Sequence, residues 1–225
     1  INMRVGIAGY GVVGKKRYSS IIKNTSFKVT DISEINPAAR GEIPQGINVF
    51  DNYNDLILKA DLDVIFISLP NKYASDAVSM SLSKGLNVFC EKPPARNLKE
   101  LMQVQKKYMQ SPNSKLMYGF NHRFHLSVEQ AKSIIDSKVY GSIINLKGVY
   151  GKSQMISFNQ TDWRTKREES GGGILLDQGI HMLDLIRYLS GENFSNVFSF
   201  VNNAFWNFDV EDNAYVLMQS PNGVI

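Results

Sequence analysis

The sequence predicts an α/β protein, with a doubly wound parallel sheet in its N-terminal half and an α+β part with a largely antiparallel open sheet in its C-terminal half. Two observations predict this fold class. Through the first half of the 225 residues, short and continuously apolar runs alternate with helix-length segments, which is typical of parallel strands covered on both faces. In the second half the short runs alternate apolar and polar residues, as antiparallel strands do.

Six strands are expected in the first half. They lie at residues 3–8, 27–32, 47–50, 64–69, 86–90 and 116–120, and the run at 47–50 is the weakest. The helices between them are expected at residues 12–23, 53–60, 73–84 and 98–109. Asn97 precedes the last of these helices and Glu100 stands at its third position, which is the pattern of a capping box. We therefore expect a first domain over residues 1–121.

The pattern changes after residue 121. A helix is expected at 126–137, a strand at 142–150, and an apolar helix at 174–189 that begins after GGG at 171–173 and ends at SG at 190–191. Two further strands are expected at 196–203 and 214–219. Asn222-Gly223 is a type I′ hairpin signal, but only two residues remain for the returning strand. We therefore expect the second domain, residues 122–225, to be an incomplete part of something longer.

Composition and charge exclude several classes of protein. With 43% hydrophobic and 20% charged residues and no low-complexity tract, the chain is expected to be globular. Its net charge of +4 comes from Lys and Arg spread along the chain, which predicts a solvated surface rather than a nucleic-acid site. The single cysteine, Cys90, excludes an internal disulfide and suits a reducing compartment. No apolar run is long enough to span a membrane and no secretory leader is evident, so we expect a cytoplasmic protein.

Three glycines follow the first predicted strand in the pattern Gly9-x-Gly11-x-x-Gly14. The first permits a tight turn, the second lets a pyrophosphate approach the backbone, and the third lets helix and strand pack closely. The next predicted helix starts here, and its N-terminal N–H groups and dipole favour phosphate. Tyr10, Val12 and Val13 lie between the glycines and are expected to contact the same ligand.

Glu34 lies twenty residues beyond Gly14, near the end of the second predicted strand. A carboxylate at this place binds the hydroxyls of an adenosine ribose, so the strand, helix and acid together predict a dinucleotide-binding Rossmann domain. A carboxylate also repels a 2′-phosphate, and the neighbouring Ile35 offers no cation, so NAD is expected rather than NADP. Arg40 could bind such a phosphate only if its loop folds back.

Lys92 stands in the stretch Cys90-Glu-Lys-Pro-Pro94, directly after a predicted strand. Ligands of doubly wound sheets bind beyond the carboxyl ends of the strands, so Lys92 is expected to point into the cofactor crevice. The alternative is a surface lysine in a loop stiffened by proline.

Asp177, His181 and Asp184 would lie along one face of the predicted helix at 174–189, surrounded by apolar residues. This polar stripe predicts a functional site, and a structural histidine is the alternative. The spacing Asp-x3-His-x2-Asp could also ligate a metal. However, neither His122 nor His125 has a clear spacing relationship to it, so no metal site is predicted.

Six stretches, in this order along the chain, resemble the glucose–fructose oxidoreductase, inositol dehydrogenase and rhizopine catabolism (Gfo/Idh/MocA) family of oxidoreductases. They are GIAGYGVVG at 6–14, SLPN at 68–71, CEKP at 90–93, GFNHRF at 119–124, DWR at 162–164 and GGGILLDQGIHMLD at 171–184. The resemblance implies a Rossmann domain and a substrate domain whose open sheet often mediates oligomerisation, here into a homodimer or homotetramer. It also implies oxidation of a hydroxyl, or reduction of the ketone, of a sugar, cyclitol or nucleotide sugar with NAD or NADP.

The resemblance implies roles for residues at matching positions. Lys92 is the motif lysine, Asp177 a substrate-binding acid and His181 the proton-transfer residue. The cofactor would contact the glycine loop, Glu34, Ser68, Leu69, Pro70, Asn71, Glu91, Lys92 and Pro93. The substrate would contact Lys92, His122, Arg123, Trp163, Arg164, Asp177 and His181. Two positions depart from the family: a histidine is frequent where Ala74 stands, and an arginine is common where His122 stands.

These residues predict a mechanism in which one group takes the proton of a hydroxyl and another stabilises charge on its oxygen. His181 has a suitable intrinsic pKa for the base, but a tuned Lys92 could also take the proton, and the choice between them stays open. Asp184 or Asp177 would orient the imidazole. Trp163 and Arg164 would form the substrate rim, or else be a packing tryptophan and a solvated arginine. The alternative functions are an NAD(P)-binding regulator without turnover and a glycoside hydrolase that uses NAD transiently.

Overall fold

The computed structural model describes residues 2–151 and 162–225. The chain divides into two compact units, Ile1–Gly119 (unit 1) and Phe120–Ile225 (unit 2). Among the residues that the structure describes, no helix combines the length and the apolar character needed to cross a bilayer.

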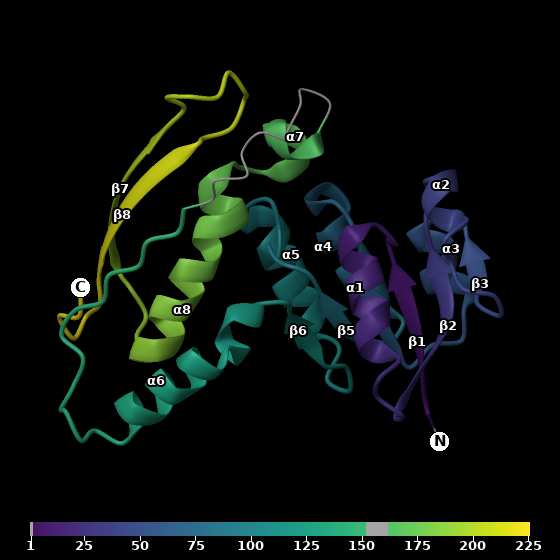
Figure 1. Ribbon diagram of the computed structural model, residues 1–225, viewed down its shortest axis with the longest axis horizontal. Helices are drawn as coiled ribbons and strands as arrows, with labels where there is room; N and C mark the ends of the chain where they lie inside the picture. The colour runs from purple at the N-terminus through teal and green to yellow at the C-terminus, as the bar shows by residue number, and fades with distance from the viewer. Residues whose placement is uncertain (1, 152–161) are drawn as a thin grey trace. The chain divides into compact units, whose positions relative to one another are not determined.

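Unit 1 is built on a six-stranded sheet in which every neighbouring pair of strands is parallel (Figure 1). The strands are β1 (Met3–Ala8), β2 (Phe27–Ser33), β3 (Asn48–Phe50), β4 (Val64–Ile67), β5 (Asn87–Cys90) and β6 (Leu116–Tyr118). Their order across the sheet is β3-β2-β1-β4-β5-β6. The chain therefore winds outward in both directions from β1 and β4, which confirms the predicted doubly wound sheet.

Helices cover both faces of this sheet. They are α1 (Val12–Ile21), α2 (Pro37–Arg40), α3 (Tyr53–Lys59), α4 (Asn71–Ser83) and α5 (Leu98–Met109). Alternate strand residues pack to opposite sides: Ile65 and Ile67 of β4 join a core with α3, α4 and α5, while Val64 and Phe66 pack toward the core of α1. Both faces of β4 are therefore apolar, which is why its sequence is continuously hydrophobic.

Helix α2 was not expected from the sequence. The Asn36 side chain accepts a hydrogen bond from the Ala38 N–H at 3.0 Å, and Pro37 takes the first helical position. An Asn followed by Pro is a readable helix start, so the sequence did carry the signal for this short helix.

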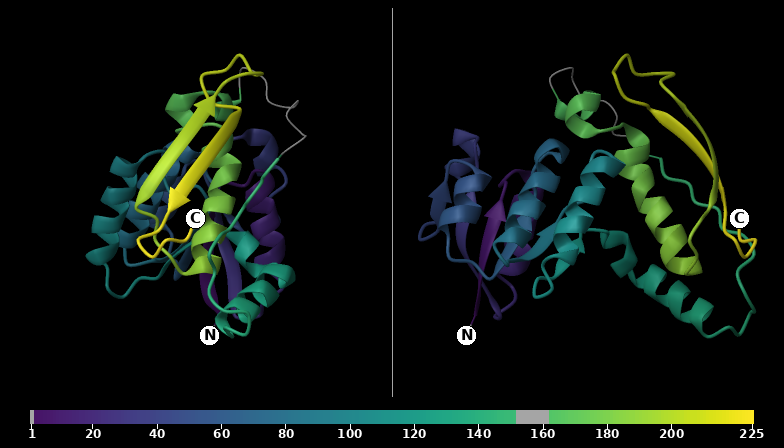
Figure 2. Two further views of the ribbon diagram at one scale, coloured as in Figure 1. Left: turned by 90° about the vertical axis from the view of Figure 1, so that its left-hand side faces the viewer. Right: turned by 180° about the vertical axis from the view of Figure 1, so that it is seen from behind.

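Unit 2 contains α6 (Leu126–Asp136), α7 (Arg167–Ser170), α8 (Ile180–Ser190), the 3-10 turns η1 (Asn121–Phe124) and η2 (Trp163–Thr165), the π-helical turn η3 (Leu175–Gly179), and strands β7 (Asn196–Asn202) and β8 (Asn213–Gln219). The two strands form an antiparallel hairpin, which Figure 2 shows from two sides. The predicted change to an antiparallel sheet in this half of the chain is confirmed.

The expected strand at 142–150 is wrong. This segment is extended, but it exchanges just two backbone hydrogen bonds with Ile225, one through Ile144 and one through Leu146. A strand needs a continuous ladder to a neighbour, and this pairing ends after two bonds.

The expected helix at 174–189 is helical throughout, but Leu175–Gly179 form the wider π turn η3, so regular α-helix α8 runs from Ile180. Glu211 holds the start of this turn: its Oε1 accepts from the Gly173 N–H at 2.8 Å and its carbonyl oxygen from the Ile174 N–H at 2.9 Å. Between the residues bonded to Glu211 and the start of α8 at Ile180, the chain forms a π turn, which is wider than an α-helical turn. The spacing that would place Asp177 and His181 one α-helical turn apart therefore does not apply.

The expected type I′ turn at Asn222-Gly223 is replaced by a turn that starts earlier. The Gly223 N–H donates to the Ser220 carbonyl at 3.0 Å, and Gly223 has φ of +86° while Asn222 stays outside the left-handed region. Pro221 fixes a φ that suits the second position of an ordinary turn, so the turn is set one residue earlier than the Asn-Gly pair alone predicts.

Candidate functional site

Loops from several strands of unit 1 meet at the carboxyl edge of its sheet, where β1 and β4 are neighbours. The Gly9 N–H donates to the Ser33 carbonyl at 2.9 Å, and the Ser68 N–H donates to the Ala8 carbonyl at 2.8 Å. The sheet order reverses direction between β1 and β4, which is the place where open α/β sheets bind ligands.

The glycine loop after β1 is shaped by two close approaches within the protein. Gly9 has φ of +89°, and a Cβ there would lie 2.6 Å from the Ser68 carbonyl oxygen. A Cβ on Gly14 would lie 2.0 Å from the Gly9 carbonyl oxygen. Both positions therefore need glycine for the fold itself.

Gly11 is different, because a Cβ there would meet nothing within 4 Å. It stands at the N-cap of α1 with φ of −71°, a value that any residue adopts. Val12 and Val13 follow with exposed side chains, and the first N–H groups of a helix have no partner inside it. The loop thus leaves space beside backbone donors, which fits a pyrophosphate.

Glu34 reaches this loop from the end of β2. Its Oε2 accepts a hydrogen bond from the Tyr10 N–H at 2.7 Å, and its Oε1 accepts from the Asn36 N–H at 2.8 Å. A carboxylate held beside the glycine loop is the group that binds ribose hydroxyls in such domains, so these residues fit a dinucleotide.

The connection from β4 to α4 consists of Ser68, Leu69 and Pro70. Pro70 is the N-cap of α4, and Asn71 is its first residue. The Ser68 Oγ is buried and makes no hydrogen bond to any residue that the structure describes. A buried hydroxyl without a partner costs free energy, and a ligand that bonds to it would remove this cost.

The segment that carries Arg40 folds back toward Glu34, which is the possibility that the sequence left open. Its Nε donates to the Glu34 carbonyl oxygen, and its guanidinium pairs with the Asp51 carboxylate at 2.6 Å. Arg40, the nearest arginine downstream of Glu34, is therefore already bonded to a carboxylate of its own.

Glu91, Lys92 and Pro93 follow β5, and the Lys92–Pro93 peptide bond is cis. The Glu91 carboxylate pairs with Arg17 of α1, whose guanidinium also lies 5.0 Å from the centre of the Phe89 ring. Glu91 thus joins α1 to β5, while the half-buried Lys92 stands at the sheet's carboxyl edge. Burial raises the pKa of the Cys90 thiol, so this cysteine stays protonated.

In unit 2 the predicted site residue His181 lies on α8 in an aromatic cluster, and the residue is only 5% exposed. The His122 ring stacks on it, with ring centres 4.1 Å apart and planes 13° apart. Tyr150 stacks on His122 at 5.7 Å, and Phe120 meets His181 edge-on at 6.3 Å. We call His122, His181 and Tyr150 the aromatic stack.

Asp184, one of the two acids expected to orient the imidazole, is bonded to Arg123. It accepts hydrogen bonds from Nε of Arg123, at 2.8 Å, and from the Nη2 of the same guanidinium. This hydrogen bonding to Asp184 raises the pKa of Arg123. The predicted substrate residue Arg123 is therefore held in an ion pair with a largely buried carboxylate.

The other predicted substrate residues of unit 2 have partners of their own. Asp177 accepts from the Gln178 Nε2 at 2.7 Å. The Arg164 guanidinium lies 4.4 Å from the centre of the Trp163 ring and 3.6 Å from Asp162. The structure thus brings His122 and His181 together, and Trp163 and Arg164 together.

Tyr150 and His125 were missed as neighbours of the site. His125 meets His122 edge-on with ring centres 5.5 Å apart. The signal for His125 was its place three residues after His122, at the end of a 3-10 turn. Tyr150 gave no local signal, because its segment was expected to be a strand.

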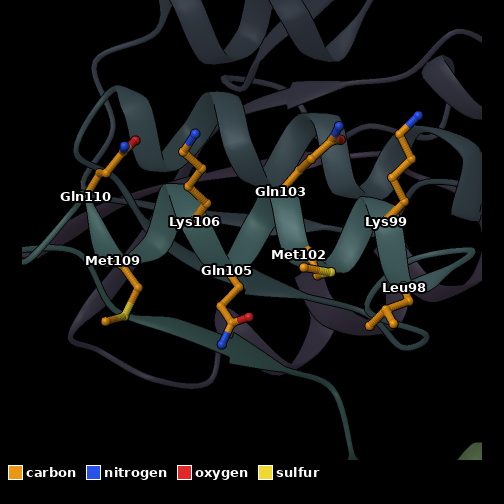
Figure 3. A pocket seen from close by; sticks show the side chains of 8 residues that line it. All are labelled: Leu98, Lys99, Met102, Gln103, Gln105, Lys106, Met109 and Gln110. Carbon is orange, nitrogen blue, oxygen red and sulfur yellow. The ribbon is translucent and has the colours of Figure 1, made fainter.

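A groove of about 900 Å³ runs along α5, and Figure 3 shows its lining side chains. All belong to α5 or to the residue that follows it: Leu98, Lys99, Met102, Gln103, Gln105, Lys106, Met109 and Gln110. No carboxylate, imidazole or hydroxyl lines this groove, so it offers no acid–base chemistry. Within the described ranges, no three His, Cys, Asp or Glu residues gather as metal ligands would.

Comparison with known proteins agrees with this geometry. Residues 3–120 match the oxidoreductase family with an NAD-binding Rossmann fold, and residues 128–225 match the GFO/IDH/MocA C-terminal domain. The chain belongs to the Gfo/Idh/MocA family. Its two matched regions follow in the order that the motifs predicted.

Several Gfo/Idh/MocA proteins of known function resemble the chain. The D-glucoside 3-dehydrogenase of Escherichia coli is 30% identical over 84% of this chain and 54% of that protein. The levoglucosan dehydrogenase of Pseudarthrobacter phenanthrenivorans is 28% identical over 85% of this chain and 52% of its own length. The chain thus spans about half the length of these relatives.

Solved structures of the family share the fold. The myo-inositol 2-dehydrogenase of Lactobacillus plantarum is 26% identical, with a TM-score of 0.88 over 100% of this chain and 68% of that one. A levoglucosan dehydrogenase in complex with NADH and levoglucosan is 26% identical, with a TM-score of 0.90 over 100% of this chain and 65% of that one.

Proposed function

We propose that this chain is part of an NAD-dependent dehydrogenase that moves a hydride between a nicotinamide and a hydroxyl-bearing carbon of a sugar, cyclitol or nucleotide sugar. The observation that carries the proposal is the glycine loop, with open space at Gly11 and the Glu34 carboxylate on the Tyr10 amide. The dehydrogenases named above, which act on glucosides, levoglucosan and inositol, support the substrate class.

NAD is proposed over NADP because acids dominate the ribose end of the site. Glu34 would repel a 2′-phosphate, and Arg40, the nearest arginine downstream, pairs with Asp51. We expect Glu34→Ala to weaken NAD⁺ binding, because the ribose hydroxyls lose their acceptor. The measurement is calorimetric titration with NAD⁺ and NADP⁺, and equal binding of NAD⁺ by the variant and the parent protein would remove Glu34 from the site.

The protein groups that we assign to the chemistry are Lys92 and His181. When bound, the nicotinamide supplies or accepts the hydride. The His181 imidazole would accept the proton of the substrate hydroxyl, and the Lys92 ammonium would stabilise charge on its oxygen. Lys92 belongs to unit 1 and His181 to unit 2.

The test measures nicotinamide absorbance with a panel of cyclitols, free sugars and sugar nucleotides, using the full-length protein with NAD⁺ and with NADP⁺. Lys92→Ala and His181→Ala should each lower kcat by about 10²–10⁴-fold while NAD⁺ still binds. Lys99→Ala, which changes an exposed lysine of the α5 groove, is the control. Full activity in either variant would remove that residue from the mechanism. Turnover without net NADH would favour the hydrolase, and NAD⁺ binding without any turnover would favour the regulator.

We also propose that the β7–β8 hairpin joins copies of the protein into a homo-oligomer. Four large apolar side chains share one face of the hairpin through the pairs Phe198–Leu217 and Phe200–Tyr215. Each is at least 60% exposed, and an exposed apolar face of this kind favours association. Phe198→Glu should give a smaller mass in analytical ultracentrifugation than the parent protein, whereas Ser199→Glu on the opposite face should not. Equal masses for Phe198→Glu and the parent would contradict the proposal.

The compartment that suits this function is reducing. The single cysteine, Cys90, is free and buried, which fits the proposed cytoplasmic location.

A further inference from the structure

His122 was expected to contact the substrate, with no role in proton transfer. Its ring covers one face of the His181 imidazole at 4.1 Å with the planes almost parallel, and the Tyr150 ring lies beside both, with its centre 5.7 Å from that of His122 and 6.2 Å from that of His181. We propose that His122 is a positioning residue that holds the His181 ring in place and carries the positive charge of the pair, so that His181 stays neutral and able to accept a proton. This inference rests on the proposed function, in which His181 is the base.

The geometry allows one proton, rather than two, on this pair near neutral pH. Two imidazolium rings stacked at 4.1 Å would repel each other, since like charges this close disfavour the doubly charged state. Such a pair takes up its two protons in separate steps, more than about one pH unit apart.

Burial decides which ring takes the first proton. His181 is 5% exposed, whereas His122 is half-buried and therefore better solvated. Burial disfavours the charged form of an imidazole, so the proton goes to His122.

Charged groups lie on the elements around the stack. Arg123 and Asp184 neutralise each other beside the stack, and Asp177 is bonded to Gln178. The His125 ring meets His122 edge-on.

Other titratable groups lie on α6, which packs against α8. Lys132 of α6 pairs with Asp136 and lies 5.8 Å from the centre of the Tyr188 ring, and Glu129 is in the first turn of the helix. Arg187 lies in the last turn of α8, and the Tyr150 hydroxyl belongs to a ring of the stack itself.

The test uses the fact that the chain has three histidines. Imidazole resonances of ¹⁵N-labelled protein are followed through a pH titration and assigned with single variants. His122→Phe keeps an aromatic ring in the stack but removes its charge. It should move the His181 midpoint to higher pH by at least about one unit, because the neighbouring charge that opposed its protonation is gone. His125→Phe, the matched control, should leave the His181 midpoint unchanged.

Kinetics of the full-length protein give the second reading. In His122→Phe, the acid limb of the kcat/KM profile should move to higher pH. At pH values below the midpoint of this limb, kcat/KM should be about tenfold lower than in the parent protein, while the plateau should be nearly unchanged. His122→Ala, which also removes the stacked ring, should in addition lower the plateau, because the imidazole loses its support.

The two proposals fail in different ways. An identical His181 titration in His122→Phe and the parent protein overturns the inference about His122, whatever the activity. Full turnover in His181→Ala overturns the assignment of the base in the proposed function, and with it the role of His122 in proton transfer, even if the coupled titration is seen.

Discussion

At the scale of single residues, the glycines of the loop after β1 serve two different ends. Gly14 is required by the fold, because a Cβ would lie 2.0 Å from the Gly9 carbonyl oxygen. Gly11 meets no such neighbour within 4 Å, so the fold itself has no use for glycine there. A residue that the fold does not require, at the N-terminus of a helix, points to the ligand as the reason for it.

This difference predicts separable effects of alanine at the two positions. Gly11→Ala should leave the free energy of unfolding within about 1 kcal/mol of the parent value but weaken NAD⁺ binding, because the methyl group enters the space left for the pyrophosphate. Gly14→Ala should destabilise the fold by about 2–4 kcal/mol through overpacking against backbone. Urea unfolding and calorimetric NAD⁺ titration measure both. Unchanged NAD⁺ affinity in Gly11→Ala would show that the open space is not the phosphate site.

Asp212 organises the loop between β7 and β8 through its carboxylate. The carboxylate accepts hydrogen bonds from the N–H groups of Ala204, Phe205 and Trp206 and from the Asn213 side chain. Burial raises the pKa of this acid, but the hydrogen bonds outweigh that effect and bring its pKa to about 2.

Because the folded pKa of Asp212 is lower than its unfolded value, the charged carboxylate stabilises the fold above about pH 4, and this contribution is lost as the pH falls toward about 2. Asp212→Asn should therefore cost about 1–2 kcal/mol at neutral pH, and the difference from the parent protein should shrink between about pH 4 and about pH 2. Urea unfolding over this range tests it. A difference that does not vary with pH would mean that the charge of Asp212 plays no part.

At the scale of elements, the start of the helical segment at η3 depends on a partner from the β7–β8 loop. Glu211 bonds to the N–H groups of Gly173 and Ile174, and its carboxylate also pairs with Arg167 at 3.3 Å. A Cβ on Gly173 would lie 1.9 Å from the Glu211 carbonyl oxygen, so the two backbones touch at this point. This contact positions the turn that carries Asp177.

Gly173→Ala should therefore push the two backbones apart and lower the free energy of unfolding by about 2–4 kcal/mol. The matched control is Gly148→Ala, whose Cβ would meet Met182 and Ile186 at ordinary distances of 3.4–3.5 Å and should change stability by less than about 1 kcal/mol. Chemical unfolding of both variants gives the comparison. Equal stabilities for the two would contradict the proposed backbone contact.

At the scale of the whole molecule, the residues proposed to contact the adenosine and the phosphates of the cofactor belong to unit 1, while His181 belongs to unit 2. A ligand stabilises the part of a protein that binds it, by about 2.7 kcal/mol at a hundredfold excess over Kd. NAD⁺ should therefore slow amide hydrogen exchange in peptides that cover residues 9–14 and Glu34. Mass spectrometry reads these peptides separately from those of unit 2, and adenosine, which has no phosphate, is the matched control ligand. Equal protection by adenosine and NAD⁺ at the glycine loop would show that the loop does not hold the pyrophosphate.

Much of unit 1 could be predicted because its signals are local. The strand β1 and the helix α5 have the predicted bounds, since an apolar run and a capping box are complete within a few neighbouring residues. The segment at 142–150 could not be predicted, because an alternating pattern gives a strand only where a partner strand continues alongside it. The π turn η3 could not be predicted either, because its anchor Glu211 is distant in sequence.

The sequence by itself determined the doubly wound sheet, the glycine loop with Glu34 as its acid, and the place of Lys92 after a strand. These features depend on residue type and short spacing, which the chain carries locally. Only the tertiary structure decided that Glu34 bonds to the Tyr10 amide, that Asp184 pairs with Arg123 and that His122 stacks on His181. These partners lie far apart in sequence, and only the packing of whole elements brings them within reach of one another.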